Sequence, residues 1–355
     1  MEPIRVGLIG CGNISAKHAQ GYKALPDLLQ VVAVCDSNEG AARACGSELG
    51  AGHVFTDHHA LLEADLVDAV DVCLPHHLHA PVTVDCLEAG LHVLVEKPIA
   101  TTLDEADRMI NAAQHAGTIL MVGHNERYDP QYQEMKRLVD AGMLGDIFCA
   151  RADHNQNFQR AGEHWLKHNW QAGGGVLIGS GIHRIDLLRW LVGEITQVFN
   201  VQVAQPDRLE GEACALTTVV FANGAIGELA SNWAVRCFPW YELMWLFGSA
   251  GNVHNVSASN TPGGIGGALY VASARDPSTA NGYRRIEVQH TSSFTEEIRH
   301  FGTCIRDGTQ PLTSGVEGRQ TLAVVLAAYQ SAQQNRPVAV EHPHHLVRPE
   351  ERRTV

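Results

Sequence analysis

The strongest constraint on the fold is a regular alternation of apolar runs with helical patterns along the first 125 residues. The apolar runs are short and almost continuous, which is typical of parallel strands that helices cover on both faces. Strand and helix repeated in this order predict a doubly wound α/β domain of the Rossmann type. The expected strands are 4–9, 31–35, 69–74, 92–96 and 118–123, and the expected helices are 14–25, 38–49, 58–64, 79–89 and 103–115.

The pattern changes after residue 125, which predicts a second domain over 126–355. Longer alternating stretches indicate an α+β domain with a large open, mostly antiparallel sheet. Residues 258–284 are rich in Gly, Ser, Ala and Asn, and we expect an exposed excursion there. The expected strands are 146–155, 195–204, 213–221, 225–234 and 241–247, and the expected helices are 130–141, 182–192, 293–306 and 316–334.

A glycine pattern between the first strand and the first helix predicts a dinucleotide site. In "VGLIGCGNISAKHA", Gly10 allows a tight turn and Gly12 allows close approach of a pyrophosphate. The helix that follows offers free N–H groups to the phosphates, and Asn13 and Ile14 belong to the same turn. Asp36 ends the second strand, where an acid can bind an adenosine ribose or cap the next helix. No Arg or Lys immediately follows Asp36, which favours NAD, with NADP possible.

Two further side chains are catalytic candidates. Lys97 stands at the carboxyl end of the fifth strand, where a parallel sheet binds ligands, and Pro98 restricts its backbone. The alternative for Lys97 is a surface ion pair with Glu96. His183 follows the glycine-rich run "GGGVLIGSG" at the start of an apolar helix, so it is either a catalyst or a core histidine beneath a permissive loop.

Composition excludes several classes of partner. With 26 Lys and Arg against 39 Asp and Glu, the formal net charge of −13 disfavours nucleic acid and anionic membrane surfaces. No apolar run approaches the roughly 20 residues of a membrane span, and the N-terminus enters a strand at once without a signal peptide. Nine scattered cysteines and histidines without ligand spacing predict a cytoplasmic protein with reduced thiols and no bound metal.

The motifs occur in a recognisable order: the glycine turn, Asp36, "LPHHLHA", Glu96-Lys97-Pro98, "GHNERYDP", the run before His183 and "SFTEEIRHFGTCIRDGTQPLTSGVEG". Over about residues 4–340 the chain resembles the glucose–fructose oxidoreductase/inositol dehydrogenase/rhizopine catabolism (Gfo/Idh/MocA) family. The resemblance implies an NAD(P) domain followed by a domain whose open sheet forms a homodimer or homotetramer, and a sugar, cyclitol or related substrate. It implies substrate contact for Lys97, proton exchange for His183, and cofactor contacts for Pro75, His76, His79, Glu96 and Lys97.

The chain departs from this family in one place. The family often has an aspartate where this sequence has Gly179, and that aspartate binds a substrate hydroxyl. Ser180, or polar residues such as Asn155, Asp153, Asn157 and His164, are candidates to replace it. Asp186, three residues after His183, is a candidate to orient the imidazole, and Trp165 or Trp170 to stack on a sugar face.

Together these features predict hydride transfer between NAD and a hydroxyl-bearing carbon, with His183 as the proton acceptor and Lys97 as a hydrogen-bond donor to the same oxygen. Lys97, Asn155, Ser180 and His183 are the expected substrate contacts. Two alternatives stay open: glycoside cleavage through oxidation, elimination and reduction, and a dinucleotide-binding sensor that has lost catalysis.

Overall fold

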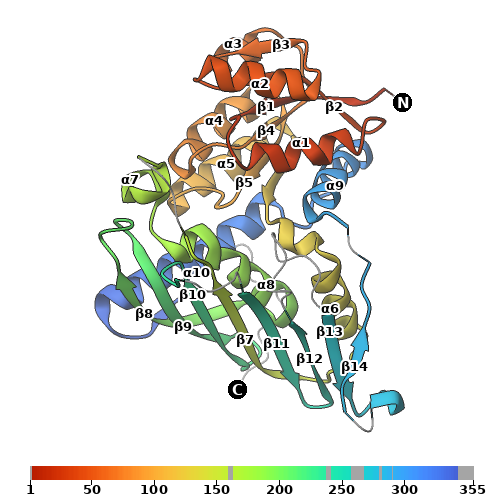
Figure 1. Cartoon of the computed structure of the whole chain (residues 1–355), viewed down its shortest axis with the longest axis vertical. Helices are drawn as coiled ribbons and strands as arrows, with labels where there is room; N and C mark the ends of the chain where they lie inside the picture. Colours follow the sequence, from red (N-terminus) through yellow and green to blue (C-terminus); the bar gives the residue numbers. More distant parts are fainter. Residues whose placement is uncertain are drawn as a thin grey trace.

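The computed structural model describes residues 2–158, 163–236, 241–256, 268–279, 282–289 and 291–342. The N-terminal part is a six-stranded parallel sheet in the order β3-β2-β1-β4-β5-β6, with helices on both faces (Figure 1). The doubly wound domain is therefore confirmed. Its elements are β1 (Ile4–Ile9), α1 (Ser15–Lys23), β2 (Leu29–Cys35), α2 (Glu39–Leu49), β3 (His53–Phe55), α3 (His58–Glu63), β4 (Ala69–Val72), α4 (His76–Glu88), β5 (His92–Glu96), α5 (Leu103–Ala116) and β6 (Leu120–Gly123).

The second part contains a nine-stranded sheet in the order β14-β13-β12-β11-β7-β10-β9-β8-β15, antiparallel except between β7 and β10. This confirms the open, mostly antiparallel sheet. Its elements are η1 (Asn125–Tyr128), α6 (Pro130–Asp140), β7 (Ile147–Asn155), η2 (Trp165–Lys167), α7 (Asn169–Ala172), the π-helical turn η3 (Leu177–Gly181), α8 (Ile182–Val192), β8 (Ile195–Ala204), β9 (Glu212–Phe221), β10 (Ile226–Asn232), β11 (Tyr241–Gly248), β12 (Gly251–Val256), β13 (Ala268–Ser273), η4 (Pro277–Thr279), β14 (Arg284–Ile286), α9 (Ser293–Asp307), α10 (Gly315–Gln334) and β15 (Val338–Ala339).

The helices α6, α8 and α10 lie between this sheet and the N-terminal part (Figure 1). The long helix α10 packs against α5 of the first sheet and against α8 and β8 of the second part. Helix α9 packs on α1, close to the glycine turn. The last two helices therefore fix how the two sheets face each other and where a site between them lies.

Several elements differ from the sequence expectation. Helix α4 begins at His76 rather than at residue 79, because Pro75 precedes its first turn. The short strand β3 and the strands β12, β14 and β15 were not predicted. Of the expected excursion, residues 257–267 and 280–281 lie outside the described residues, and 268–273 form strand β13 with Leu269 and Val271 fully buried. That part of the prediction was wrong, because cross-strand pairing stabilises a segment whose composition favours loops.

Among the described helices, none combines the length and the apolar content that crossing a bilayer requires.

Candidate active site

A cavity of about 780 Å³ lies at the carboxyl ends of the parallel strands, facing the second sheet. Its lining comes from the β1–α1 turn, the ends of β2, β4 and β5, and from η1, β7, η3, α8 and β11. The carboxyl edge of a doubly wound sheet is where such folds bind ligands. The predicted lining residues found here are Gly10, Gly12, Asn13, Ile14, Asp36, Pro75, His76, Glu96, Lys97, Ser180 and His183.

The glycine turn has the geometry that a pyrophosphate needs. Gly10 has φ +96°, and a Cβ there would lie 2.4 Å from the carbonyl oxygen of Cys73. A Cβ on Gly12 would meet open space, and it would fill the cavity in front of the turn. The Ser15 hydroxyl donates to the Gly12 carbonyl at 2.6 Å, and the first turn of α1 carries no acidic side chain. The free N–H groups at this helix start therefore fit the phosphates of NAD.

Asp36 is held in place by backbone groups on both of its oxygens. Oδ2 accepts from the Cys11 N–H at 2.8 Å, and Oδ1 accepts from the Asn38 N–H at 2.8 Å. The carboxylate lines the cavity, where its remaining lone pairs can accept from a ribose. It does not cap α2, because the Asn38 side chain accepts from the Ala41 N–H instead.

The first turn of α4 forms one wall of the cavity through Pro75 and His76. His76 is buried, its Nδ1 lies 2.7 Å from the Ala172 carbonyl oxygen, and its ring meets the edge of Trp165 at 4.6 Å. Burial lowers the pKa of His76 well below its usual value, so the ring is neutral at pH 7. Trp165 thus reaches the cavity, whereas Trp170 is 70% exposed and does not line it.

His79 and Glu96, both predicted to contact the cofactor, interact with other residues of the chain. His79 does not line the cavity, because it is fully buried with its two ring nitrogens 2.7 Å from the carbonyl oxygens of Pro98 and Leu74. The structure therefore places His79 behind the cavity wall. Glu96 lines the cavity, and its Oε1 lies 3.1 Å from Nε2 of the buried His18.

His18, Asp71 and Cys73 bring potential metal ligands within 4.8 Å of one another. The ring of His18 is already engaged on both sides, with Nδ1 2.8 Å from Asp71 and Nε2 3.1 Å from Glu96. The Tyr22 hydroxyl also donates to Asp71 at 3.0 Å. This network connects α1, β4 and β5 beneath the cofactor end of the cavity.

Lys97 points across the cavity to the second part of the chain. Its Nζ donates to the Gly179 carbonyl oxygen at 2.7 Å, in the π-helical turn η3 that precedes α8. Lys97 therefore points to Gly179 rather than to Glu96, the partner in the surface ion pair that was the alternative from the sequence. Burial lowers the pKa of Lys97, although the charge of Glu96 opposes the shift.

His183 stands in the first turn of α8 and lines the same cavity as Lys97. Its Nδ1 is buried and has no hydrogen-bond partner among the described residues. Burial, and then the charge of Lys97, lower the pKa of His183 well below its usual value. The buried ring of His124 stands edge-on to it at 6.3 Å, and burial lowers the pKa of His124 to about 4. His183 is therefore a neutral base at pH 7.

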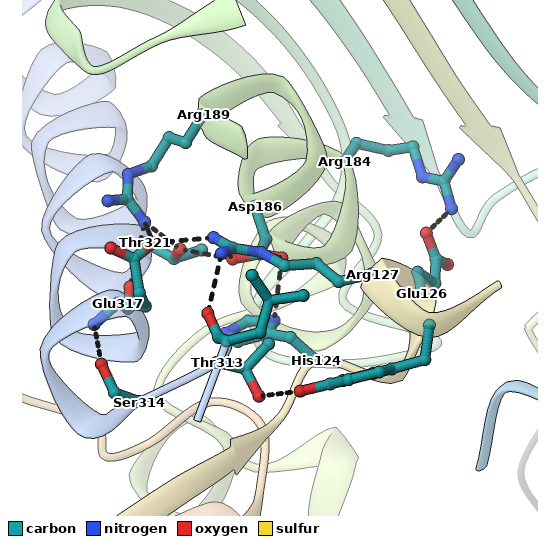
Figure 2. Close-up of polar contacts among 12 residues, drawn as sticks. His124, Glu126, Arg127, Arg184, Asp186, Arg189, Thr313, Ser314, Glu317 and Thr321 are labelled. Atoms are coloured by element: carbon teal, nitrogen blue, oxygen red, sulfur yellow. Dashed lines mark hydrogen bonds and ion pairs between the residues drawn. The ribbon is translucent and has the colours of Figure 1, made fainter. Parts of the chain in front are cut away.

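Asp186 does not orient His183, contrary to one expectation from the sequence. Its two oxygens accept from the Arg127 guanidinium at 2.7 Å each, and Oδ1 also accepts from the Thr321 hydroxyl at 3.0 Å (Figure 2). Arg127 donates further to Glu317 at 2.9 Å. Burial raises the pKa of Asp186, but the charge of Arg127 prevails and holds it well below its usual range. This buried network joins α8 to η1 and α10, and thereby fixes the helix that carries His183.

The structure explains why residue 179 is glycine. A Cβ on Gly179 would lie 2.3 Å from the ring of Trp233, which is 2% exposed and lines the cavity. The Trp233 indole N–H donates to the Ser180 hydroxyl at 3.0 Å, and its ring stacks on Phe158 at 4.2 Å. An aromatic wall therefore fills the space in which a side chain at 179 would lie.

Strand β7 presents different residues to the cavity from those predicted. His154 and Gln156 line it, whereas Asn155 does not, because successive side chains of a strand point to opposite faces. The charged pair Arg151 and Asp153 shares the face of Asn155. Arg151, whose side chain is 51% exposed, was the signal that sequence reasoning missed, since a charge that points outward at an odd position places the even positions inside. Nor does Asn157 line the cavity, although His164 does.

Glu242 of β11 is a lining residue for which the sequence offered no signal. It stands directly opposite His154 in the antiparallel pairing of β11 with β7. Its Oε1 lies 2.9 Å from His154 Nδ1. The two strands thus bring a carboxylate and an imidazole together at the strand side of the cavity.

Two family models match this chain. Residues 4–124 match the oxidoreductase family with an NAD-binding Rossmann fold, and residues 132–254 match a C-terminal domain of the same Gfo/Idh/MocA family. The match covers the parallel sheet and strands β7 to β11 of the second sheet, and it includes most of the residues that line the cavity.

Similar proteins span nearly the whole chain. Myo-inositol 2-dehydrogenase of Thermotoga maritima is 28% identical, covering 95% of this chain and 99% of its own. D-apiose dehydrogenase of Paraburkholderia graminis is 28% identical, covering 94% and 89%. A solved structure of levoglucosan dehydrogenase with NADH and levoglucosan has the same fold, with a TM-score of 0.89, 23% identity and coverage of 96% and 100%. The chain belongs to the Gfo/Idh/MocA family of oxidoreductases, with an NAD-binding Rossmann domain at its N-terminus.

Proposed function

We propose that this protein is an NAD-dependent dehydrogenase that oxidises a hydroxyl-bearing carbon of a sugar, a cyclitol or a derivative. The observation that carries the proposal is the meeting of Lys97 and His183 in the cavity that also contains the glycine turn and Asp36. The names of the relatives support the substrate class, since they are dehydrogenases of inositol, apiose and levoglucosan.

Each residue has a separate role in the proposed reaction. His183, neutral at pH 7 because burial and Lys97 lower its pKa, accepts the proton of the substrate hydroxyl. Lys97 donates a hydrogen bond to the same oxygen and stabilises the negative charge that develops there. The nicotinamide of bound NAD supplies the acceptor for the hydride that leaves the carbon. Gly10, Gly12 and Asp36 hold the cofactor, and the residues that line the cavity orient the substrate.

Substitution of each catalytic residue tests the assignment. We expect His183→Ala and Lys97→Ala to lower turnover by about a hundredfold or more with NAD affinity nearly unchanged. Absorbance of NADH during a screen of polyols and aldoses measures turnover, and calorimetry measures NAD binding. His115→Ala, an exposed change on α5, is the matched control. Full activity in both site variants would overturn the assignment, and glycoside cleavage without NADH accumulation would replace it with the elimination mechanism.

We also propose a homodimer or homotetramer that forms through the outer face of the nine-stranded sheet. Val201 and Leu216 stand directly opposite each other on β8 and β9 and are 46% and 55% exposed, and Val203 is 59% exposed. An exposed apolar patch of this kind is typical of an interface. Light scattering after chromatography should show an oligomer for the wild type and a smaller species for Leu216→Asp.

The proposed compartment is the cytoplasm. Eight cysteines in the described part of the chain are free thiols, and several of them are buried. Reduced thiols fit a reducing compartment. The net charge of −13 supports a small-molecule substrate rather than nucleic acid or an anionic membrane surface as the partner.

A further inference from the structure

The strand side of the cavity carries a carboxylate and an imidazole that the proposed hydride transfer does not use. Glu242 and His154 are cross-strand neighbours with 2.9 Å between Oε1 and Nδ1, and both line the cavity. The His154 side chain is 3% exposed and that of Glu242 is 18% exposed. Glu242 is thus mostly buried while a part of it reaches the space that a substrate would enter.

A buried arginine holds the same carboxylate from behind. Arg184 of α8 is fully buried, and its guanidinium lies 3.6 Å from Glu242 Oε2. The same guanidinium binds Glu126 and the Tyr132 hydroxyl (Figure 2 shows the contact with Glu126). Arg184 itself does not line the cavity. Glu242 is therefore held by His154 on one side and by Arg184 on the other. The Arg184 guanidinium lies outside the cavity lining and does not meet an incoming ligand.

Most of the charged groups that line the cavity are negative. Within the described residues, its lining contains one ammonium group, that of Lys97, and no guanidinium group. The lining contains five carboxylates, those of Asp36, Glu96, Glu126, Asp129 and Glu242. Asp36 lies at the cofactor end of the cavity, whereas Glu126, Asp129 and Glu242 come from the second part of the chain. A carboxylate or phosphate on a substrate beside these three carboxylates would be desolvated next to like charges, with no arginine partner among the described residues, which disfavours its binding.

The remaining wall suits a neutral ring. Phe158 and Trp233 are stacked on each other and line the cavity, so they offer an apolar surface to the C–H face of a sugar or cyclitol. Carboxylates accept hydroxyl donors through short, charge-assisted hydrogen bonds. One apolar wall and one carboxylate wall together match a ring with an apolar face and several hydroxyl groups.

We propose that Glu242, positioned by His154 and Arg184, binds substrate hydroxyl groups and restricts the site to uncharged polyhydroxylated rings, excluding sugar acids and sugar phosphates. This inference rests on the proposed dehydrogenase function and names its substrate class and a specificity-determining residue. A carboxylate at position 179 would have no room in this cavity, because Trp233 fills that space.

Substrate discrimination by the wild-type enzyme is the first test. We expect kcat/KM for neutral rings such as glucose, methyl glucoside and myo-inositol to exceed that for glucuronate and a glucose phosphate by about a hundredfold, since like charges disfavour the anions. NADH formation measures each value. A glucose phosphate or glucuronate turned over as well as the best neutral ring would overturn the inference.

The second test removes the charge of Glu242 without changing its shape. We expect Glu242→Gln to raise KM for the best neutral substrate by about tenfold, with a smaller effect on kcat. We also expect a smaller ratio of kcat/KM for that substrate to kcat/KM for glucuronate. Glu228→Gln is the matched control, since Glu228 stands on β10 with its side chain 58% exposed and pairs with Arg151. His154→Asn should raise KM while keeping the discrimination, because it leaves the carboxylate in place. Wild-type KM and discrimination in Glu242→Gln would contradict the inference.

A binding measurement separates the two proposals. Calorimetry with the NADH-loaded protein should show that the neutral substrate binds the wild type about tenfold more tightly than it binds Glu242→Gln. If no sugar in the panel yields NADH, the dehydrogenase proposal fails, and the calorimetry still tests Glu242. If the wild type oxidises a neutral sugar and Glu242→Gln binds it equally well, only the role of Glu242 fails.

Discussion

The side-chain nitrogen of Lys97 lies 2.7 Å from the carbonyl oxygen of Gly179, so one hydrogen bond joins the end of β5 to the π-helical turn before His183. Lys97 and Gly179 are 82 positions apart in the chain, and the Lys97 ammonium group lies in the cavity that His183 also lines. Single-turn π-helices inside α-helices are frequent at functional sites. In the proposed mechanism, the charge of Lys97 therefore acts on a substrate oxygen and on His183 at the same time.

The pH dependence of the reaction should reveal this second effect. In the proposed mechanism, oxidation requires neutral His183, so we expect kcat/KM to fall as the pH falls through its lowered pKa, below the usual value of about 6.5. In Lys97→Met the nearby positive charge is lost, and the pKa of His183 rises. We expect the acid limb of the residual kcat/KM profile to move to higher pH, whereas the limb of Lys136→Met stays in place. A limb that does not move in Lys97→Met would show that the two groups are not coupled.

Gly179 should tolerate no side chain while Trp233 is present. Because a Cβ at Gly179 would lie 2.3 Å from the indole, we expect Gly179→Ala to lower the free energy of unfolding by about 1–3 kcal/mol. Gly52→Ala is the control, since a Cβ there meets open space. Combining Gly179→Ala with Trp233→Leu should cost less than the sum of the two single changes, because both act on one contact. Urea unfolding measures all four variants, and simple additivity would refute the explanation.

The buried ion pair between Asp186 and Arg127 should matter more to stability than any surface pair. Asp186→Asn leaves the Arg127 charge without its main partner, so we expect a loss of about 3–5 kcal/mol in the free energy of unfolding. Asp140→Asn breaks the exposed pair with Lys136 and should cost at most about 1 kcal/mol. Denaturant titrations compare the two. Equal losses would show that the network does not anchor α8.

The selectivity between cofactors should depend on Asp36. Its carboxylate lines the cavity and would repel the phosphate on the ribose of NADP. We expect Asp36→Ala to weaken NAD binding by about tenfold and to reduce the preference for NAD over NADP, as calorimetry with both cofactors would show. The melting temperature is recorded alongside, because Asp36 also accepts from the N–H groups of Cys11 and Asn38. An unchanged preference would assign the selectivity to another residue.

Local pattern was sufficient for the parts of the site that depend on neighbours in the chain. The glycine turn, Asp36 and Lys97 each follow a strand of the parallel sheet, and the carboxyl ends of such strands meet at one edge. The same reasoning was wrong for Asn155, because the neighbouring His154 lines the cavity instead. Successive side chains of a strand point to opposite faces of the sheet. The charge of Arg151, which is exposed on the outer face, contained the information needed to choose the inner face.

The sequence by itself determined the parallel sheet, the turn for the cofactor, and the positions of Lys97 and His183 at the ends of their elements, because periodicity and turn chemistry act over a few residues. Only the tertiary structure decided that Glu242 faces His154, that Trp233 occupies the space beside Gly179, and that Asp186 binds Arg127 rather than His183. Each of these pairs joins residues about 50–90 positions apart. Strand pairing and close packing bring such residues together, and no local pattern in the sequence indicates which distant side chains will be in contact.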